Sequence, residues 1–179
     1  PSPWRRIRSV AHGDFQVLRV RRDWMLSPLD GTEHARVVLE APDWVNIIPR
    51  TRDGQVVLVR QFRFGVDANS LEIPGGVTEP GEDPLLAAER ELEEETGFKA
   101  ARVVPLGAVH PNPAIQTNRC HCFLALDCER LHQGRPESTE DISVELYDSA
   151  DVARLIASGQ ITHSLVLCAF MLEQLRSKA

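Results

Sequence analysis

Residues Gly76–Phe98 read GVTEPGEDPLLAAERELEEETGF, and this stretch combines a helix signal with an unusual density of acids. Asp83 is a favourable N-cap, and Pro84 suits the first helical position. The spacing predicts a helix over Pro84–Thr96, with Gly97 as its C-terminal stop. One helix in the middle of the chain therefore follows from local signals alone.

A helical wheel separates an apolar face of this helix from an acidic one. The apolar face, which we expect in the core, contains Leu85, Ala88 and Leu92, with Thr96 beside them. The acidic face carries three glutamates at contacting spacings: Glu91, Glu94 and Glu95. Each like-charge pair costs about 0.2–0.5 kcal/mol, and the helix dipole disfavours anions near the C-terminal end. Something beyond the helix must compensate for this charge.

Two interpretations account for the acidic face. A solvated charged surface would normally contain lysines between the acids, but Glu82–Gly97 has no lysine and only one arginine, Arg90. A divalent cation is the alternative, because Mg²⁺ and Mn²⁺ prefer carboxylate oxygens. Gly75 and Gly76 let the backbone approach a ligand and expose carbonyls as further ligands. The sequence thus favours a metal site that acts on a phosphate-bearing substrate.

The segments around this helix are rich in strand signals. Asp53-Gly54 predicts a hairpin. Helices are expected over Asp151–Ala157 and Ser164–Arg176. Strands are expected over Phe15–Arg22, Ala35–Glu40, Trp44–Ile48, Gln55–Phe62, Ser70–Pro74, Val103–Val109, Arg119–Asp127 and Ile142–Tyr147. Mixed strands with helices in the middle and at the end predict an α+β fold around one core.

Composition and charge limit the possible partners. The chain has 179 residues, which suits one domain with at most a small extra lobe. A net charge of −6 argues against a nucleic-acid duplex or an anionic membrane. It leaves room for a phosphorylated small molecule, because a metal ion supplies positive charge locally. With no signal-peptide pattern and no apolar run of the ~18–20 residues that span a membrane, we expect a cytoplasmic protein.

Three of the four cysteines, Cys120, Cys122 and Cys128, lie close together in the sequence. A zinc site is one interpretation, but C-x-C lacks the usual C-x2–4-C spacing. We favour a buried strand in which cysteine behaves as a small apolar residue.

The quoted stretch resembles a complete Nudix box, G-x5-E-x7-R-E-U-x-E-E-x-G-U, in which U is a bulky apolar residue. Its fixed positions are filled by Gly76, Glu82, Arg90, Glu91, Leu92, Glu94, Glu95, Gly97 and Phe98. The box covers 23 residues, so it identifies the superfamily and not the substrate.

The resemblance implies a Nudix-type α/β/α sandwich with a mixed sheet, and hydrolysis of a nucleoside diphosphate linked to another moiety. It implies two to three Mg²⁺ or Mn²⁺ ions. The implied metal ligands are Glu91, Glu95 and the Gly75 carbonyl, with Glu94 as a further ligand or catalytic group. Four box residues are implied to be mainly structural: Gly76, Glu82, Arg90 and Gly97.

The flanking residues resemble the ADP-ribose pyrophosphatase and nucleotide-sugar hydrolase group. The resembling segments are Gln61-Phe62-Arg63, Ser70–Gly76, Pro113, which lies 15 residues beyond Phe98, Glu140–Leu146 and Gly159-Gln160-Ile161. The likeness runs from about Trp44 to the end, so we expect a Nudix domain over residues 43–179. In relatives, a segment like residues 1–42 forms a small antiparallel sheet that can swap across a homodimer.

The same resemblance suggests roles at the substrate. A loop acid is expected to act as general base; Glu140 is our choice, with Glu137 and Glu145 as alternatives. Arg63 is expected to bind phosphate, with Glu72 and Pro113 nearby, although Arg63 can also be an ordinary surface arginine. Phe15, Trp24 or Trp44 can stack on a base or belong to the core.

Three functions remain open. The first is a pyrophosphatase for ADP-ribose or an ADP-sugar that yields AMP and a sugar phosphate. The second applies the same chemistry to GDP-mannose, NADH or a dinucleoside polyphosphate. The third is a non-catalytic nucleotide sensor, which loss of Glu91 or Glu95 would favour; both are present.

Overall fold

The computed structural model describes residues 1–135 and 141–176. These residues form two compact units. Unit 1 consists of Pro1–Pro42 together with His110–Arg119, and unit 2 consists of Asp43–Val109 together with the chain from Cys120 onward. Each unit is described below by itself.

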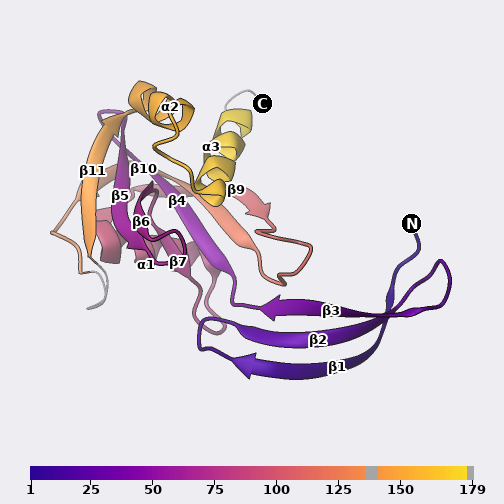
Figure 1. Cartoon of the computed structure of the whole chain (residues 1–179). Helices are drawn as coiled ribbons and strands as arrows, with labels where there is room; N and C mark the ends of the chain where they lie inside the picture. The colour runs from indigo at the N-terminus through magenta and orange to yellow at the C-terminus, as the bar shows by residue number, and fades with distance from the viewer. Residues whose placement is uncertain (136–140, 177–179) are drawn as a thin grey trace. The chain divides into compact units, whose positions relative to one another are not determined.

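Unit 1 is built on a three-stranded antiparallel sheet in the order β1-β2-β3 (Figure 1). The strands are β1 (Arg5–Asp14), β2 (Arg19–Leu26) and β3 (Glu33–Glu40). The loop that belongs to this unit is tied to β3, because the Leu39 N–H donates to the Ile115 carbonyl at 2.7 Å. A bridge between Leu39 and Gln116 continues this contact.

The expected strand over Phe15–Arg22 is wrong in its first half. Residues 15–18 form a turn, in which the Phe15 N–H donates to the Leu18 carbonyl at 2.9 Å and Gln16 has a left-handed φ of 65°. The strand before this turn, β1, was not expected. Its pairing with β2 shifts register between Arg6 and Arg8 and again between Ala11 and Gly13. Such bulges disrupt the period-two alternation that identifies a strand in sequence.

Unit 2 contains a mixed sheet with the path β11-β5-β4-β10-β8; β6 pairs with β5, β7 with β4 and β9 with β10. Strands β4 and β10 run parallel, and the other pairs are antiparallel. The bounds are β4 Trp44–Thr51, β5 Gln55–Arg63, β6 Ala68–Glu72, β7 Gly75–Val77, β8 Phe98–Lys99, β9 Arg102–Val109, β10 Cys120–Arg130 and β11 Ile142–Asp148. The expected hairpin turn at Asp53-Gly54 joins β4 to β5.

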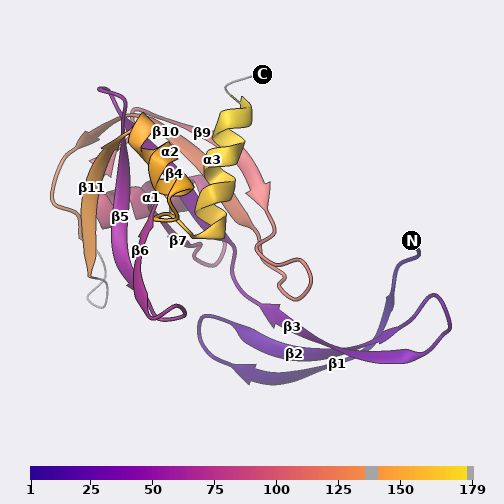
Figure 2. The same cartoon turned by 45° about the horizontal axis from the view of Figure 1, so that its top comes forward.

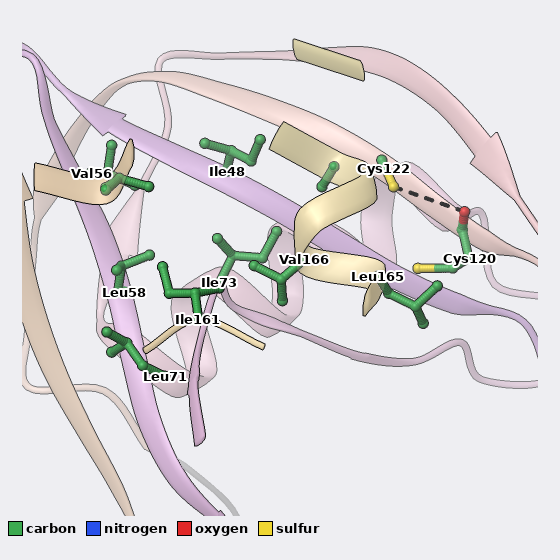
Figure 3. Close-up of a cluster of buried hydrophobic side chains, with 12 residues drawn as sticks. Ile48, Val56, Leu58, Leu71, Ile73, Cys120, Cys122, Ile161, Leu165 and Val166 are labelled. Atoms are coloured by element: carbon green, nitrogen blue, oxygen red, sulfur yellow. Dashed lines mark hydrogen bonds between the residues drawn. The ribbon is translucent and has the colours of Figure 1, made fainter. Parts of the chain in front are cut away.

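Helices cover both faces of this sheet. They are α1 (Pro84–Thr96), α2 (Ser149–Ala157) and α3 (Ser164–Arg176). Side chains of β4 divide between two cores: Val45 and Ile47 pack with α1, whereas Ile48 packs with α2 and α3. Figure 3 shows the second core, where Leu165 and Val166 of α3 approach β4 and β5. Unit 2 is therefore a layered α/β/α arrangement.

The cysteines of β10 are part of these cores. Cys120, Cys122 and Cys128 are buried, and all four cysteines are free thiols. Across the described residues, none of the helices is both long and apolar enough to cross a membrane.

Candidate active site

Helix α1 is fixed at both ends by the signals in its sequence. The Asp83 carboxylate accepts the Leu85 N–H at 2.8 Å, and Pro84 starts the helix. At the other end Gly97 has a φ of 72°, and its N–H donates to the Glu93 carbonyl at 2.8 Å. These caps fix the bounds of the helix and so place the glutamates in its last two turns.

Glu95 points into the protein and not into solvent. The residue is 4% exposed, and its carboxylate accepts the N–H of Gly75 at 3.2 Å. Gly75 is held in place because β7 pairs with β4, where Asn46 lies opposite Gly75. The structure thus brings together one acid of the helix and the glycine pair that precedes it.

Glu91 lies directly against Gly76. A Cβ atom added at Gly76 would overlap both carboxylate oxygens of Glu91. Only glycine leaves room for this carboxylate beside the backbone of β7. The glycine pair and the helix therefore form a cradle with Glu91 and Glu95 inside it.

Arg90 is a cation that binds Glu82 and two acids of the acidic face, Glu91 and Glu94. Its Nε and Nη2 atoms donate to the two oxygens of Glu82 at 2.9 and 3.1 Å. Its Nη1 atom donates to Glu91 at 2.9 Å and to Glu94 at 3.0 Å. The hydrogen bonds to Glu82, followed by the nearby charges of Glu91 and Glu94, raise the pKa of Arg90 above its usual value. The pKa of Glu82 is lowered in turn, first by Arg90 and then by the Glu79 N–H.

The donor chemistry around α1 fits a divalent cation. Within the ranges 1–135 and 141–176, no three His, Cys, Asp or Glu side chains converge in a ligating arrangement. Arg90 Nη1 lies between Glu91 and Glu94 and holds both carboxylates. The cradle nevertheless offers hard oxygen donors beside a backbone that only glycine permits. The carboxylates of Glu91 and Glu94 would then bind the metal as well as Arg90. Arg90 would still be held by its two hydrogen bonds to Glu82.

Arg63 and Glu72 form a two-pronged ion pair at the end of β5 and β6. Arg63 Nε donates to Oε1 at 3.0 Å, and Nη2 donates to Oε2 at 2.6 Å. Glu72 is 2% exposed. Burial alone would raise the pKa of Glu72, but the hydrogen bonds and charge of Arg63 lower it below the usual value. Glu72 therefore stays ionised and fixes the plane of the Arg63 guanidinium.

Of the three acids proposed as general base, Glu145 lies within the described residues. Glu137 and Glu140 lie outside the described residues. Glu145 lies on β11, where Arg60 Nε donates to it at 2.6 Å and the Tyr147 hydroxyl donates to its other oxygen. Chiefly through the hydrogen bond from Arg60, the pKa of Glu145 is lowered. A carboxylate held this way is a poor proton acceptor.

A backbone clamp at the end of α1 was missed from the sequence. After β10, the Leu131 N–H donates to the Gly97 carbonyl at 2.9 Å, and the Arg135 N–H donates to the Glu94 carbonyl at 2.6 Å. Gly134 packs against the carbonyls of Glu94 and Glu95. The clamp satisfies carbonyls that a helix leaves unpaired at its C-terminus. In the sequence, Gly134 is the one sign of this clamp, and a single glycine does not indicate which distant segment it contacts.

The remaining candidates belong to unit 1 or to the core of unit 2. Pro113 is exposed and belongs to unit 1. Also in unit 1, Phe15 is 62% exposed, and the guanidinium of Arg8 lies 3.6 Å from the ring centre of Trp24. Trp44 packs against the core of unit 2.

Asn46 is a polar residue at the site that the sequence did not single out. It is 9% exposed, lies opposite Gly75, and its Nδ2 atom has no hydrogen-bond partner in the part of the chain that the structure describes. In sequence it is one polar residue inside an apolar strand, which carries no signal of its own.

Known proteins resemble this chain in sequence. The NUDIX domain model matches residues 42–168. An ADP-ribose pyrophosphatase of Bacillus subtilis (strain 168) is 32% identical over 149 residues, covering 82% of this chain and 80% of the relative. One from Mycobacterium tuberculosis is 29% identical, covering 84% and 73%. A GDP-mannose pyrophosphatase of Citrobacter koseri is 28% identical, covering 74% and 73%.

A solved structure has the same fold. The crystal structure of an ADP compounds hydrolase superposes with a TM-score of 0.87 at 20% identity, covering 99% of this chain and 97% of that one. This likeness confirms the expected α+β, Nudix-type fold. The family model spans more than half of the chain. The chain therefore belongs to the NUDIX family, as a Nudix hydrolase similar to the ADP-ribose pyrophosphatases.

Proposed function

We propose that this protein hydrolyses the diphosphate bond of ADP-ribose or a related nucleoside diphosphate sugar, giving a nucleoside monophosphate and a sugar phosphate. The observation that carries the proposal is the cradle: Glu91 against Gly76 and Glu95 on the Gly75 N–H. It places two carboxylates beside the backbone of the glycine pair, and carboxylate oxygens are the donors that Mg²⁺ prefers at a phosphate-transfer site. The relatives named ADP-ribose pyrophosphatase support the substrate class.

In this proposal, two to three Mg²⁺ or Mn²⁺ ions would be held by Glu91, Glu95, Glu94 and the Gly75 carbonyl. Such ions would neutralise charge at the diphosphate and lower the pKa of water. The chain's own part is to keep the donors in place. Gly75 fixes Glu95, Gly76 admits Glu91, and Arg90 bound to Glu82 limits the repulsion among the acids.

Proton transfer from the attacking water needs a carboxylate with no strong partner. We propose Glu140 for this role, with Glu137 as the alternative. Both follow Arg135, whose N–H is bonded to the Glu94 carbonyl. Glu145 is disfavoured, because Arg60 and Tyr147 already occupy its oxygens.

Arg63 is our proposed contact for a substrate phosphate. Glu72 binds its Nε and Nη2 atoms and so sets the plane of the guanidinium. A pre-oriented guanidinium loses less freedom when it binds an anion. Pro113 is proposed to lie near the substrate on the family resemblance alone. The same chemistry on GDP-mannose is the second candidate, favoured by the Citrobacter koseri relative.

The test is a panel of ADP-ribose, ADP-sugars, GDP-mannose, NADH and dinucleoside polyphosphates with Mg²⁺. Phosphate is measured after a phosphatase has acted on the products. We expect ADP-ribose or an ADP-sugar to give the highest kcat/KM. The hydrolase proposal would be refuted if the protein hydrolysed none of these compounds.

A matched pair of variants ties the activity to the cradle. Glu95→Gln keeps the shape of a buried side chain but removes its charge, and should lower turnover by about a hundredfold or more. Glu93→Gln changes a neighbouring, half-exposed acid and should leave turnover nearly unchanged. Equal activities of the two variants would contradict the role of Glu95.

We further propose that the protein is a homodimer joined through unit 1. Every residue of β1 but one is exposed, including Ile7 at 48% and Val10 at 39%. Across the same sheet, Val37 is 48% exposed. An isolated sheet with this much apolar surface gains stability by pairing with a second copy. Light scattering should give twice the chain mass; a monomer at micromolar concentration would argue against this proposal.

A further inference from the structure

A groove of about 650 Å³ lies on the face of unit 2 that α3 covers. Its floor is aliphatic, formed by Val104 of β9 and by Leu124 and Leu126 of β10. Its rim is charged and carries Arg50, Arg102, Glu173 and Arg176. In Figure 2, α3 runs alongside β9 and β10. The lining of the groove includes Glu173, Gln174 and Arg176, which belong to the last turn of that helix. We refer to it as the α3 groove.

The α3 groove is separate from the cradle. Along β10, Cys122 and Leu124 belong to the core that packs against α3, whereas Phe123 and Ala125 belong to the core that packs against α1. Side chains alternate between the two faces of a strand, so Leu126 lies on the same face as Cys122 and Leu124. A ligand on this floor is therefore on the opposite face of the sheet from Glu91 and Glu95.

The rim has an excess of positive charge. Arg50 Nε donates to Glu173 at 2.6 Å, so the single acid of the rim is already neutralised. Arg176 donates from Nη1 to the Pro105 carbonyl at 2.5 Å, which is a neutral partner, and no carboxylate of the described residues forms an ion pair with it. Arg102 is exposed, and its side chain forms no hydrogen bond or ion pair within residues 1–135 and 141–176. Two guanidinium charges thus face this groove in a protein of net charge −6.

We propose that the α3 groove binds a small organic phosphate with a flat or apolar body, such as a nucleoside monophosphate. Guanidinium groups pair with phosphate oxygens in a planar, two-pronged geometry, and they also stack on flat rings. An apolar ligand that covers the aliphatic floor removes it from water, which favours binding. Inorganic phosphate would leave this floor exposed to water. The volume lies within the range of small-molecule sites. Binding requires neither turnover nor a metal, so this inference goes beyond the proposed function.

The test is a titration of the whole 179-residue chain with AMP, followed by NMR of the backbone amides. EDTA is present throughout, so that no divalent ion directs AMP to the cradle. We expect shifts of the amides of Arg102, Leu124, Leu126 and Arg176. Ribose 5-phosphate and inorganic phosphate should bind more weakly, since neither covers the floor. The absence of shifts at these residues, or equal affinity for all three probes, would overturn the proposal.

Variants separate this groove from other anion sites. Arg102→Ala and Arg176→Ala should each weaken AMP binding by about tenfold or more, because each removes charge-assisted hydrogen bonds. The control Arg154→Ala changes an exposed arginine of α2 that pairs with Asp151, and should have no effect. Glu95→Gln should leave groove binding intact even where it abolishes turnover. Unchanged AMP affinity in both groove variants would refute the assignment without bearing on the hydrolase activity.

Discussion

Gly75 and Gly76 are adjacent, yet a methyl group added at each meets different atoms. At Gly75 it would overlap the backbone carbonyl of Val45, which the pairing of β7 with β4 holds in place. At Gly76 it would overlap only the carboxylate of Glu91, the end of a flexible side chain. The two positions therefore separate the stability of the sheet from the geometry of the acids.

From this difference we predict opposite phenotypes. Gly75→Ala should cost about 3 kcal/mol in the free energy of unfolding, because backbone cannot move aside cheaply. Gly76→Ala should cost less than about 1 kcal/mol but lower kcat/KM strongly, because Glu91 is displaced. Urea unfolding and steady-state kinetics on the same samples measure both quantities. Normal activity in Gly76→Ala would show that the position of Glu91 does not matter.

Arg63 determines how the stability of the protein responds to acid at Glu72. The pKa of Glu72 is lowered from 4.5, so its contribution to stability is complete above about pH 4.5 and is lost as the pH falls further. In Arg63→Ala, burial is left as the main effect and raises the pKa of Glu72. Protonation of Glu72 then stabilises the folded state as the pH falls. The contribution of Glu72 to the free energy of unfolding therefore changes with pH in the opposite direction to that in the wild type.

The measurement is the free energy of unfolding between pH 7 and pH 4 for both proteins. We expect Arg63→Ala to be the less stable protein at pH 7 and the difference to shrink toward pH 4. Arg52→Ala, which removes an exposed pair with Glu129, serves as the control and should run parallel to the wild type. Parallel profiles for Arg63→Ala as well would mean that the two side chains are not coupled.

At the scale of elements, the end of α1 is held by contacts with a distant segment of the chain. Gly97 has a left-handed φ of 72°, and a Cβ atom there would overlap the His132 carbonyl of the clamp. Gly81 has a similar φ of 82° but open space around it. Gly81→Ala should therefore cost about 1 kcal/mol from the backbone alone, and Gly97→Ala clearly more. Thermal and urea unfolding would test this; equal costs would mean that the clamp yields easily.

The same helix shows what sequence can and cannot predict. The bounds Pro84–Thr96 follow from the caps Asp83 and Gly97, which act within a few residues, and they agree with the structure. The acidic face was also visible from spacing. The burial of Glu95 could not be predicted from spacing, because the direction of its side chain depends on the pairing of β7 with β4.

Contacts between distant segments explain the other gaps. Strand β1 escaped prediction because its two register shifts break the alternation of side chains. The Arg63–Glu72 pair and the clamp at Gly97 join residues that no local pattern connects. The groups that carry the proposed chemistry are local in sequence, whereas the groups that hold them in place are not.

At the scale of the whole molecule, the proposed metal is expected to serve activity and not folding. Two apolar cores hold unit 2 together on either side of its sheet, and a chain of this length needs no structural metal. We predict that EDTA abolishes turnover but leaves the circular dichroism spectrum unchanged. Mg²⁺ at about a hundredfold excess over its Kd should raise the Tm by about 5 °C, because binding to the folded state alone stabilises it.

The source of that Tm increase can be assigned with one variant. In Glu91→Gln/Glu95→Gln, the removal of two carboxylates should eliminate the response to Mg²⁺, since Glu94 alone binds the ion weakly. Without Mg²⁺ the variant should unfold at or above the wild-type Tm, because repulsion within the acidic face is reduced. A response to Mg²⁺ equal to that of the wild type would place the ion elsewhere, and unfolding by EDTA would make the metal structural.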